Sequence, residues 1–217
     1  MFIHPWDAAL DAEEWRAWVA ATERFGVLAV GNVDPAAAPL VVPTHFTATD
    51  GALLVHLARP NPVWPHLERA AEVRLALSGD YAYIPSSWRA KGGDADGVPT
   101  SYYTSVQFVC APTIIDDAEG KAEVLRAQLA DFQPEGAPLD LEAERYARML
   151  PGLRAVRLTI LSVEAKFKYD DHQPVEHRER VSARLEDRGR GLDRAAARQQ
   201  RRRLERIGDW QEFTSGA

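Results

Sequence analysis

The sequence contains a single cysteine, Cys110, among its 217 residues. One cysteine excludes an internal disulfide and a cysteine-rich zinc site, so a reducing, cytoplasmic location is the expectation. Cys110 lies in an apolar run and is predicted to be a small buried residue. No apolar run approaches the roughly 20 residues that span a bilayer, and no signal peptide is predicted at the N-terminus. A membrane partner is therefore not expected.

Several motifs that mark catalysis or nucleotide binding are also missing. The sequence has no GxSxG, no HExxH, no P-loop and no GxGxxG between a predicted strand and a predicted helix. Any chemistry is therefore expected to come from a bound cofactor. The formal net charge of −6 argues against a broad nucleic-acid surface.

Short apolar and β-branched runs separated by turn residues predict many antiparallel strands. The strands are expected at 26–33, 40–47, 52–58, 73–78, 81–85, 106–115 and 154–163. Helices are expected at 11–24, 66–71, 117–132 and 140–150, and a loop at 90–97. This pattern favours a mostly β fold with peripheral helices (α+β), in which the strands form a barrel rather than a parallel sheet.

The C-terminal part of the chain differs in composition. From about residue 176 arginine and glutamate dominate, so we expect a domain over 1–175 and a charged helical tail over 176–217. Residues 195–206 predict a basic helix that could contact nucleic acid. A solvated helix, or an arm that packs on a dimer partner, is the preferred interpretation, because the acidic remainder of the chain would repel a duplex.

Residues 56–66 (HLARPNPVWPH) predict a corner between a strand and a short helix. Arg59 offers a fork of N–H donors to a phosphate or carboxylate, and the start of the helix adds free backbone N–H groups. Such a corner can hold an anionic cofactor. A tight turn with a surface arginine is the alternative interpretation.

Residues 56–64 (HLARPNPVW) resemble the HLARxNPxW segment of the PaiB-like proteins. Four further segments support the resemblance in the same order: 43–46 (PTHF), 81–88 (YAYIPSSW), 98–103 (VPTSYY) and 165–168 (AKFK). The family is described as FMN-binding negative transcriptional regulators. The resemblance implies a split β-barrel of the FMN-binding type over about 175 residues. It also implies a homodimer in which each barrel lends residues to the cofactor pocket of the other.

Three departures from the PaiB-like pattern bear on the cofactor. His66 stands at a position that we expect to vary, residues 169–172 (YDDH) replace a neutral or cationic segment, and 101–105 (SYYTS) are rich in hydroxyl groups. These departures resemble the haem-dependent piperazate synthase branch, which closes N5-hydroxy-L-ornithine into a ring through an N–N bond. The alternatives are an exposed helix histidine, a solvated acidic turn and ordinary strand surface.

That resemblance implies haem b as the cofactor, with FMN as the alternative. His66 is the expected axial ligand of the iron, and His45 and His56 are the fallbacks. The other residues expected at the cofactor are Arg59, Asn61, Trp64, Arg69 and His56. Asp170 and Asp171 would orient the amine of the substrate, a hydroxylated diamino acid, and Tyr103 or Lys168 would protonate the leaving hydroxide. A PaiB-like regulator and a flavin-dependent oxidoreductase remain the competing interpretations.

Overall fold

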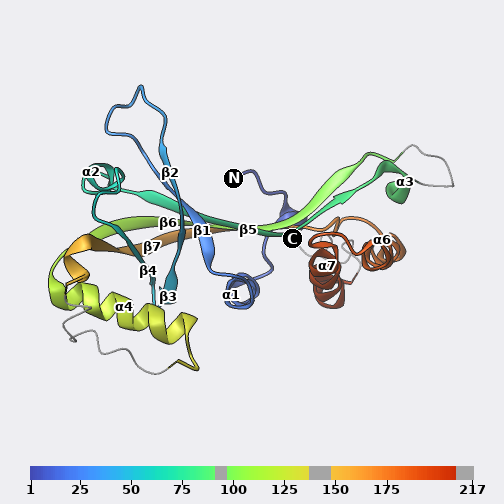
Figure 1. Ribbon diagram of the computed structural model, residues 1–217. Coiled ribbons are helices and arrows are strands. Elements are labelled where there is room, and N and C mark those ends of the chain that lie inside the picture. The colour runs from blue at the N-terminus through green and yellow to red at the C-terminus, as the bar shows by residue number, and fades with distance from the viewer. Residues whose placement is uncertain (91–96, 137–147, 209–217) are drawn as a thin grey trace. The chain divides into compact units, whose positions relative to one another are not determined.

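A computed structural model describes residues 1–90, 97–136 and 148–208 of the chain (Figure 1). The strands form one seven-stranded sheet with the order β2-β1-β5-β6-β7-β4-β3. Their bounds are β1 Phe25–Val30, β2 Leu40–His45, β3 Thr47–Thr49, β4 Ala52–Ala58, β5 Val73–Ile84, β6 Thr100–Ile115 and β7 Leu153–Lys168. The α-helices are α1 Ala12–Ala21, α2 Trp64–Leu67, α3 Ser86–Arg89, α4 Ala118–Phe132, α6 Val175–Arg188 and α7 Asp193–Ile207. Two short 3-10 helices, η1 Pro5–Asp7 and η2 Leu150–Gly152, complete the described elements.

The chain divides into two compact units. The barrel unit comprises Glu23–Leu77 and Gln107–Val163. The helical unit comprises Met1–Thr22, Ser78–Val106 and Glu164–Ala217. The domain boundary expected after residue 175 stays a prediction.

The sheet of the barrel unit closes on itself. β2 and β3 stand at opposite ends of the strand order, yet only Phe46 separates them along the chain. The Phe46 N–H donates to the Arg24 carbonyl, which joins this segment to the start of β1. β1–β2, β1–β5, β3–β4 and β4–β7 all pair in the antiparallel sense. The predicted antiparallel barrel is therefore confirmed.

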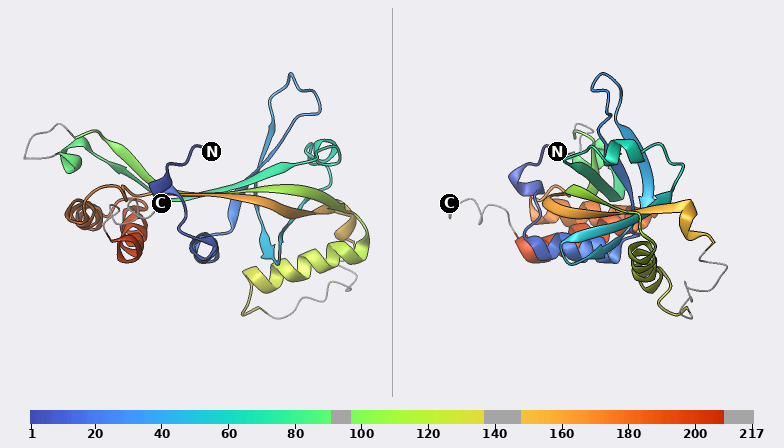
Figure 2. Two further views of the ribbon diagram at one scale, coloured as in Figure 1. Left: turned by 180° about the vertical axis from the view of Figure 1, so that it is seen from behind. Right: turned by 90° about the vertical axis from the view of Figure 1, so that its left-hand side faces the viewer.

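β4 is apolar at nearly every position because both of its faces are covered. Leu53 and Val55 are buried on one face, while Leu54 packs with Val124 of α4 and Ala155 of β7 on the other. α4 lies alongside β3 and β4 (Figure 2). Its first turn is capped by Asp117, whose carboxylate accepts from the Gly120 N–H, as the predicted helix at 117–132 requires.

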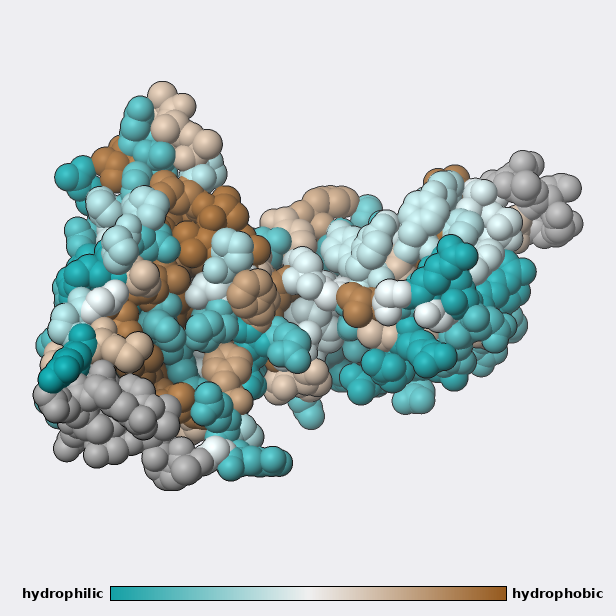
Figure 3. All heavy atoms as spheres, in the orientation of Figure 1, coloured by the Kyte–Doolittle hydropathy of each residue, from teal (hydrophilic) through white to brown (hydrophobic). Residues whose placement is uncertain are grey.

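The exposed side chains of β1 and β2 form an apolar area on the face shown in Figure 3. Phe25 and Val27 of β1 are 62% and 38% exposed, and Val41 of β2 is 59% exposed. Val41 pairs across the strands with Ala29, and Val27 with Pro43. These neighbours therefore form one continuous apolar strip on the outside of the barrel unit.

The helical unit contains the basic helix predicted at 195–206. This helix, α7, packs along α6 (Figure 1). Ala196 and Ala197 are buried, and so are the polar side chains of Gln200 and Arg203. The preferred interpretation of a solvated tail is therefore wrong, because α7 contributes to the interior of this unit.

Other sequence-based expectations have mixed outcomes. The strands expected at 73–78 and 81–85 are one strand, β5, in which Asp80 adopts a left-handed conformation with φ 53°. Cys110 is buried, and burial raises the pKa of its thiol to about 11. The predicted loop at 90–97 and the predicted helix at 140–150 fall largely outside the described residues. None of the described helices is long and apolar enough to cross a membrane.

Candidate functional site

The strand-to-helix corner at 56–66 belongs to the barrel unit, and two of its predicted cofactor residues hold its backbone. The Asn61 side-chain oxygen accepts from the Val63 N–H at 3.0 Å. The Trp64 indole N–H donates to the Ala58 carbonyl at 2.9 Å, and the guanidinium of Arg154 lies 4.8 Å from the centre of the indole ring. Asn61 and Trp64 therefore fix the corner rather than face a ligand.

Arg59 is also committed within the fold. Its guanidinium pairs with the Asp116 carboxylate, and its Nε–H donates to the Pro151 carbonyl at 2.6 Å. The hydrogen bond to Asp116 raises the pKa of Arg59 above its ordinary value. The expected role of Arg59 as a free fork for an anion would require this pair to break.

A cavity of about 280 Å³ opens beside the same corner. Its polar lining includes Asn32, His66, Arg69 and Glu72. Arg69 has no ion pair or side-chain hydrogen bond among the residues that the structure describes. The cavity therefore combines one available guanidinium with a histidine and one carboxylate.

The hydrogen bond of His66 determines which ring nitrogen carries the proton. His66 Nδ1 lies 2.9 Å from the Val33 backbone nitrogen. A backbone N–H can only donate, so Nδ1 is the acceptor and the neutral ring is protonated at Nε2. A protonated ring nitrogen cannot bind iron. In this geometry His66 is an N–H donor to the cavity, not the axial ligand that we expected.

His56, on β4, has the opposite tautomer. The Gln128 amide nitrogen donates to the Leu54 carbonyl at 3.2 Å, which turns the amide oxygen toward His56 Nδ1. Because that oxygen only accepts, the proton of the neutral imidazole is on Nδ1. Nε2 then keeps its lone pair, and it has no hydrogen-bond partner among the described residues.

His45 lies beside His56, with the ring centroids 5.1 Å apart. It also contacts Phe132 edge-to-face at 5.4 Å. Burial, and then the neighbouring His56, lower the pKa of His45 below its ordinary value. The barrel unit therefore holds two adjacent histidines on β2 and β4, one with a lowered pKa and one with an available nitrogen.

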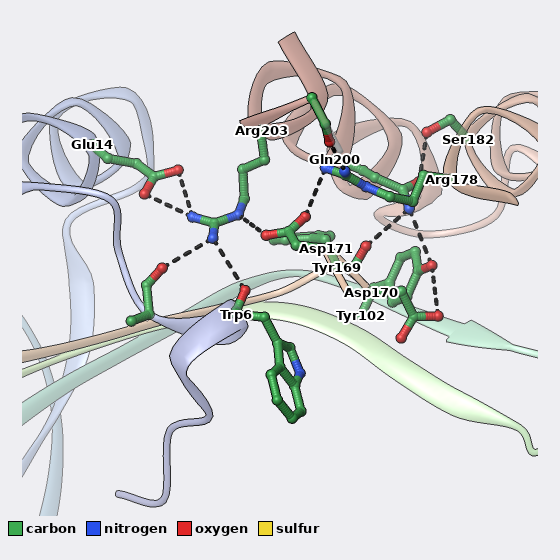
Figure 4. A network of polar contacts seen from close by, with 12 residues as sticks. Trp6, Glu14, Tyr102, Tyr169, Asp170, Asp171, Arg178, Ser182, Gln200 and Arg203 are labelled. Carbon is green, nitrogen blue, oxygen red and sulfur yellow. Dashed lines mark hydrogen bonds and ion pairs between the residues drawn. The ribbon is translucent and has the colours of Figure 1, made fainter. Parts of the chain in front are cut away.

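A second polar cluster lies in the helical unit around Asp170 (Figure 4). Asp170 is 3% exposed and adopts a left-handed backbone with φ 58°. Its Oδ2 accepts from the Tyr102 hydroxyl at 3.1 Å and lies 3.0 Å from Arg89 Nε and 3.6 Å from His177 Nε2. Burial alone would raise the pKa of Asp170, but His177 and Arg89 outweigh it and hold that pKa below its ordinary value. The Oδ1 atom has no hydrogen bond or ion pair among the described residues.

Asp171 has a different environment, although it is adjacent in sequence. Its side chain is fully buried, and its two oxygens accept from Arg178 at 2.9 Å and Arg203 at 2.5 Å. Arg203 also donates to the carboxylate of Glu14 (Figure 4). Asp171 therefore has no oxygen left for a substrate amine, and we assign it to the folded framework instead of the predicted catalytic role.

Tyr103 and Lys168 lie close together in the helical unit. The ammonium groups of Lys166 and Lys168 are 5.7 Å and 6.0 Å from the centre of the Tyr103 ring. Lys168 donates to the Thr100 hydroxyl at 3.0 Å, and Lys166 donates to the Phe2 carbonyl at 2.9 Å. The two predicted proton donors are thus neighbours, and Lys168 keeps two further N–H protons.

Several residues of these clusters were not predicted from the sequence. They are Arg89 and His177 beside Asp170, Gln128 beside His56, and Arg203 beside Asp171. The position of Gln128 could have been predicted from the helix pattern. It follows Val124 by one turn, on the face of α4 that packs on β4. Arg89 and Arg203 come from segments far along the chain, and His177 follows Asp170 by seven residues without a local pattern.

Comparisons with known proteins agree with this fold. Residues 1–162 match the model of the family described as "Putative FMN-binding domain". The chain is similar to the "Protease synthase and sporulation protein PAI 2" of Bacillus subtilis, with 24% identity over 184 residues that cover 80% of this chain and 83% of that protein.

Two solved structures have the same fold. The flavocytochrome Anf3 from Azotobacter vinelandii has a TM-score of 0.57 and 19% identity, over 75% of this chain and 70% of that one. The FAD and haem binding protein from Mycobacterium smegmatis has a TM-score of 0.54 and 16% identity, over 75% of this chain and 73% of that one. These likenesses confirm the predicted split barrel.

Proposed function

The chain belongs to this FMN-binding-domain family, and within the family we propose that it is a haem-dependent enzyme. The enzyme converts N5-hydroxy-L-ornithine to L-piperazate with loss of water. The observation that carries the proposal is the lone pair on His56 Nε2. The two solved structures named above support it, because their printed descriptions are those of a flavocytochrome and a FAD and haem binding protein on the same fold.

The residues around His56 fit a haem iron. Histidines that bind metals usually donate their other ring N–H to a fixed acceptor, which sets the tautomer and orients the ring. Gln128 is such an acceptor for His56, and its amide is itself held by the Leu54 carbonyl. His56 would therefore hold the iron through Nε2. When bound, the haem would supply an iron centre that assists departure of the hydroxylamine oxygen.

The proposed reaction is balanced without an external oxidant or reductant. The α-amine nitrogen attacks N5, the N–N bond forms as the N–O bond breaks, and the oxygen leaves as water. The α-amine loses one proton and the departing oxygen gains one. A general base near the amine and a general acid near the oxygen would assist both transfers.

The helical unit contains residues whose chemistry suits a general base and a general acid. Lys168 has protons to donate beyond its bond to Thr100, and Tyr103 offers a phenolic proton beside it. Asp170 Oδ1 is available to accept from an ammonium group. By the resemblance, Asp170 is the residue expected to orient an amine, and Lys168 or Tyr103 the residue expected to protonate a leaving hydroxide.

A flavin is the second candidate cofactor, and the cavity beside α2 favours it. Arg69 and the Nε2–H of His66 are donors that could hold the phosphate of FMN there. The chain would then be a PaiB-like FMN-binding transcriptional regulator or a flavin-dependent oxidoreductase. Glu72 in the same cavity lining opposes an anion, which weakens this candidate.

The proposal is tested by incubating the haem-loaded protein with N5-hydroxy-L-ornithine and following the product by mass spectrometry. We expect a product lighter by one water, and a large loss of turnover in Lys168→Met or Tyr103→Phe. Arg201→Met, which removes an exposed partner of Glu186, is the control and should keep full turnover. No dehydrated product from the wild-type protein would refute the proposal.

A further inference from the structure

The helical unit contains a second cavity, of about 110 Å³, that the proposed reaction does not use. It lies between α1, β5 and α7, and the ion pairs Arg203–Glu14 and Arg206–Asp11 hold α7 against α1. One wall carries Asp80, whose left-handed backbone places it next to α1.

The carboxylate of Asp80 is fixed in position. The indole N–H of Trp18 donates to Asp80 Oδ2 at 2.7 Å. Gly79 makes room for this indole, because a Cβ at residue 79 would lie 3.0 Å from Trp18 Cζ2. Asp80 Oδ1 has no hydrogen bond or ion pair among the described residues, so one oxygen remains for a ligand.

The opposite wall is formed by α7 and carries positive charge. Arg198 and Arg202 line the cavity one helical turn apart, and neither has an acidic partner among the described residues. Other arginines of α7 are paired, since Arg201 binds Glu186 and Arg206 binds Asp11. Arg198 and Arg202 are therefore two arginines of α7 that line the cavity without an acidic partner among the described residues.

Gln199 supplies an independent observation that points to a ligand. Its side chain lines the cavity and is only 4% exposed, yet its amide has no hydrogen bond among the described residues. Polar groups that line a cavity are hydrogen-bonded to the protein, to ordered water or to a molecule in the cavity. The amide is thus available to a molecule held between Asp80 and the arginines.

We propose that this cavity binds a small α-amino acid. Its carboxylate would be held by Arg198 and Arg202, and its ammonium group by Asp80 Oδ1. The Ala21 and Ala195 methyl groups and the Trp18 ring form apolar lining that accepts a short aliphatic side chain. The volume excludes nucleotides and haem, and Asp80 disfavours a lone anion. This site is independent of the proposed synthase activity.

The indole N–H of Trp18 gives a direct readout of binding, because it is bonded to Asp80. In a two-dimensional ¹H–¹⁵N spectrum of the full chain, with the signal identified by its loss in Trp18→Phe, we expect L-alanine to shift this resonance in a saturable way. Acetate and ethylammonium, which each carry one half of the recognised group, should leave it in place at the same concentrations.

Variants of α7 complete the test. Arg202→Gln and Arg198→Gln should each weaken L-alanine binding at least about tenfold, the loss of one charge-assisted contact. Arg201→Gln lies on the same helix but is paired with Glu186, and should bind as the wild type does. An unmoved Trp18 signal with L-alanine, an equal shift with acetate alone, or equal affinity in all three variants would overturn the proposal.

Discussion

Replacing Arg203 with methionine tests whether the C-terminal helices belong to the interior of the helical unit. Arg203 is fully buried and donates from Nε to Asp171, from Nη1 to Glu14 and from Nη2 to the Ala8 carbonyl. Methionine keeps much of the volume but removes every donor. Asp171 retains Arg178, whereas Glu14, which is nearly buried, loses its ion pair. Breaking a buried pair in this way costs about 3–5 kcal/mol.

The free energy of unfolding, measured by urea denaturation with tryptophan fluorescence, checks this value. Arg201→Met is the matched control, because it removes an exposed pair on the same helix, worth less than about 1 kcal/mol. Glu14→Gln in the Arg203→Met background should recover part of the loss by removing the unpaired charge. If Arg203→Met costs no more than the control, α7 is not held by this network and the reasoning fails.

Two further outcomes are expected. The pKa of Asp170 is lowered in the folded chain, so its contribution to stability is complete above its ordinary pKa of 3.8 and is lost as the pH falls through the lower folded value. Asp170→Asn, which tolerates the left-handed backbone, should therefore lose less stability than the wild type between pH 5 and pH 3 in urea titrations, and an equal loss would contradict the assignment. The homodimer implied by the family resemblance stays a prediction. Val41→Glu on the exposed apolar strip should give a monomer by light scattering, and a monomeric wild type would refute the dimer.

The sequence predicted the elements whose signals are local. Asp11 and Asp117, the first residues of the helices predicted at 11–24 and 117–132, cap α1 and α4. The apolar run at 52–58 became β4. The antiparallel barrel was predicted from the short apolar and β-branched runs separated by turn residues. These features depend on neighbours within a few positions, and the sequence displays those directly.

The sites depend on contacts that the sequence does not display. Arg203 meets Glu14 across 189 positions, and Gln128 selects the tautomer of His56 across 72. Asp170 and Asp171 are adjacent and looked equivalent, but one points to Tyr102 and the other to Arg178 and Arg203. The sequence favours His66 over His56 because residue 66 departs from the family pattern. It does not show that the Val33 backbone N–H donates to His66 Nδ1.

The absorption spectrum of the haem-loaded protein tests the central claim most directly. If His56 Nε2 binds the iron, the wild type and His66→Ala will show the same Soret band, while His56→Ala will lose or shift it and keep its far-ultraviolet circular dichroism. An unchanged band in His56→Ala together with its loss in His66→Ala would contradict the assignment. A wild-type protein that takes up FMN and no haem would contradict the synthase proposal itself.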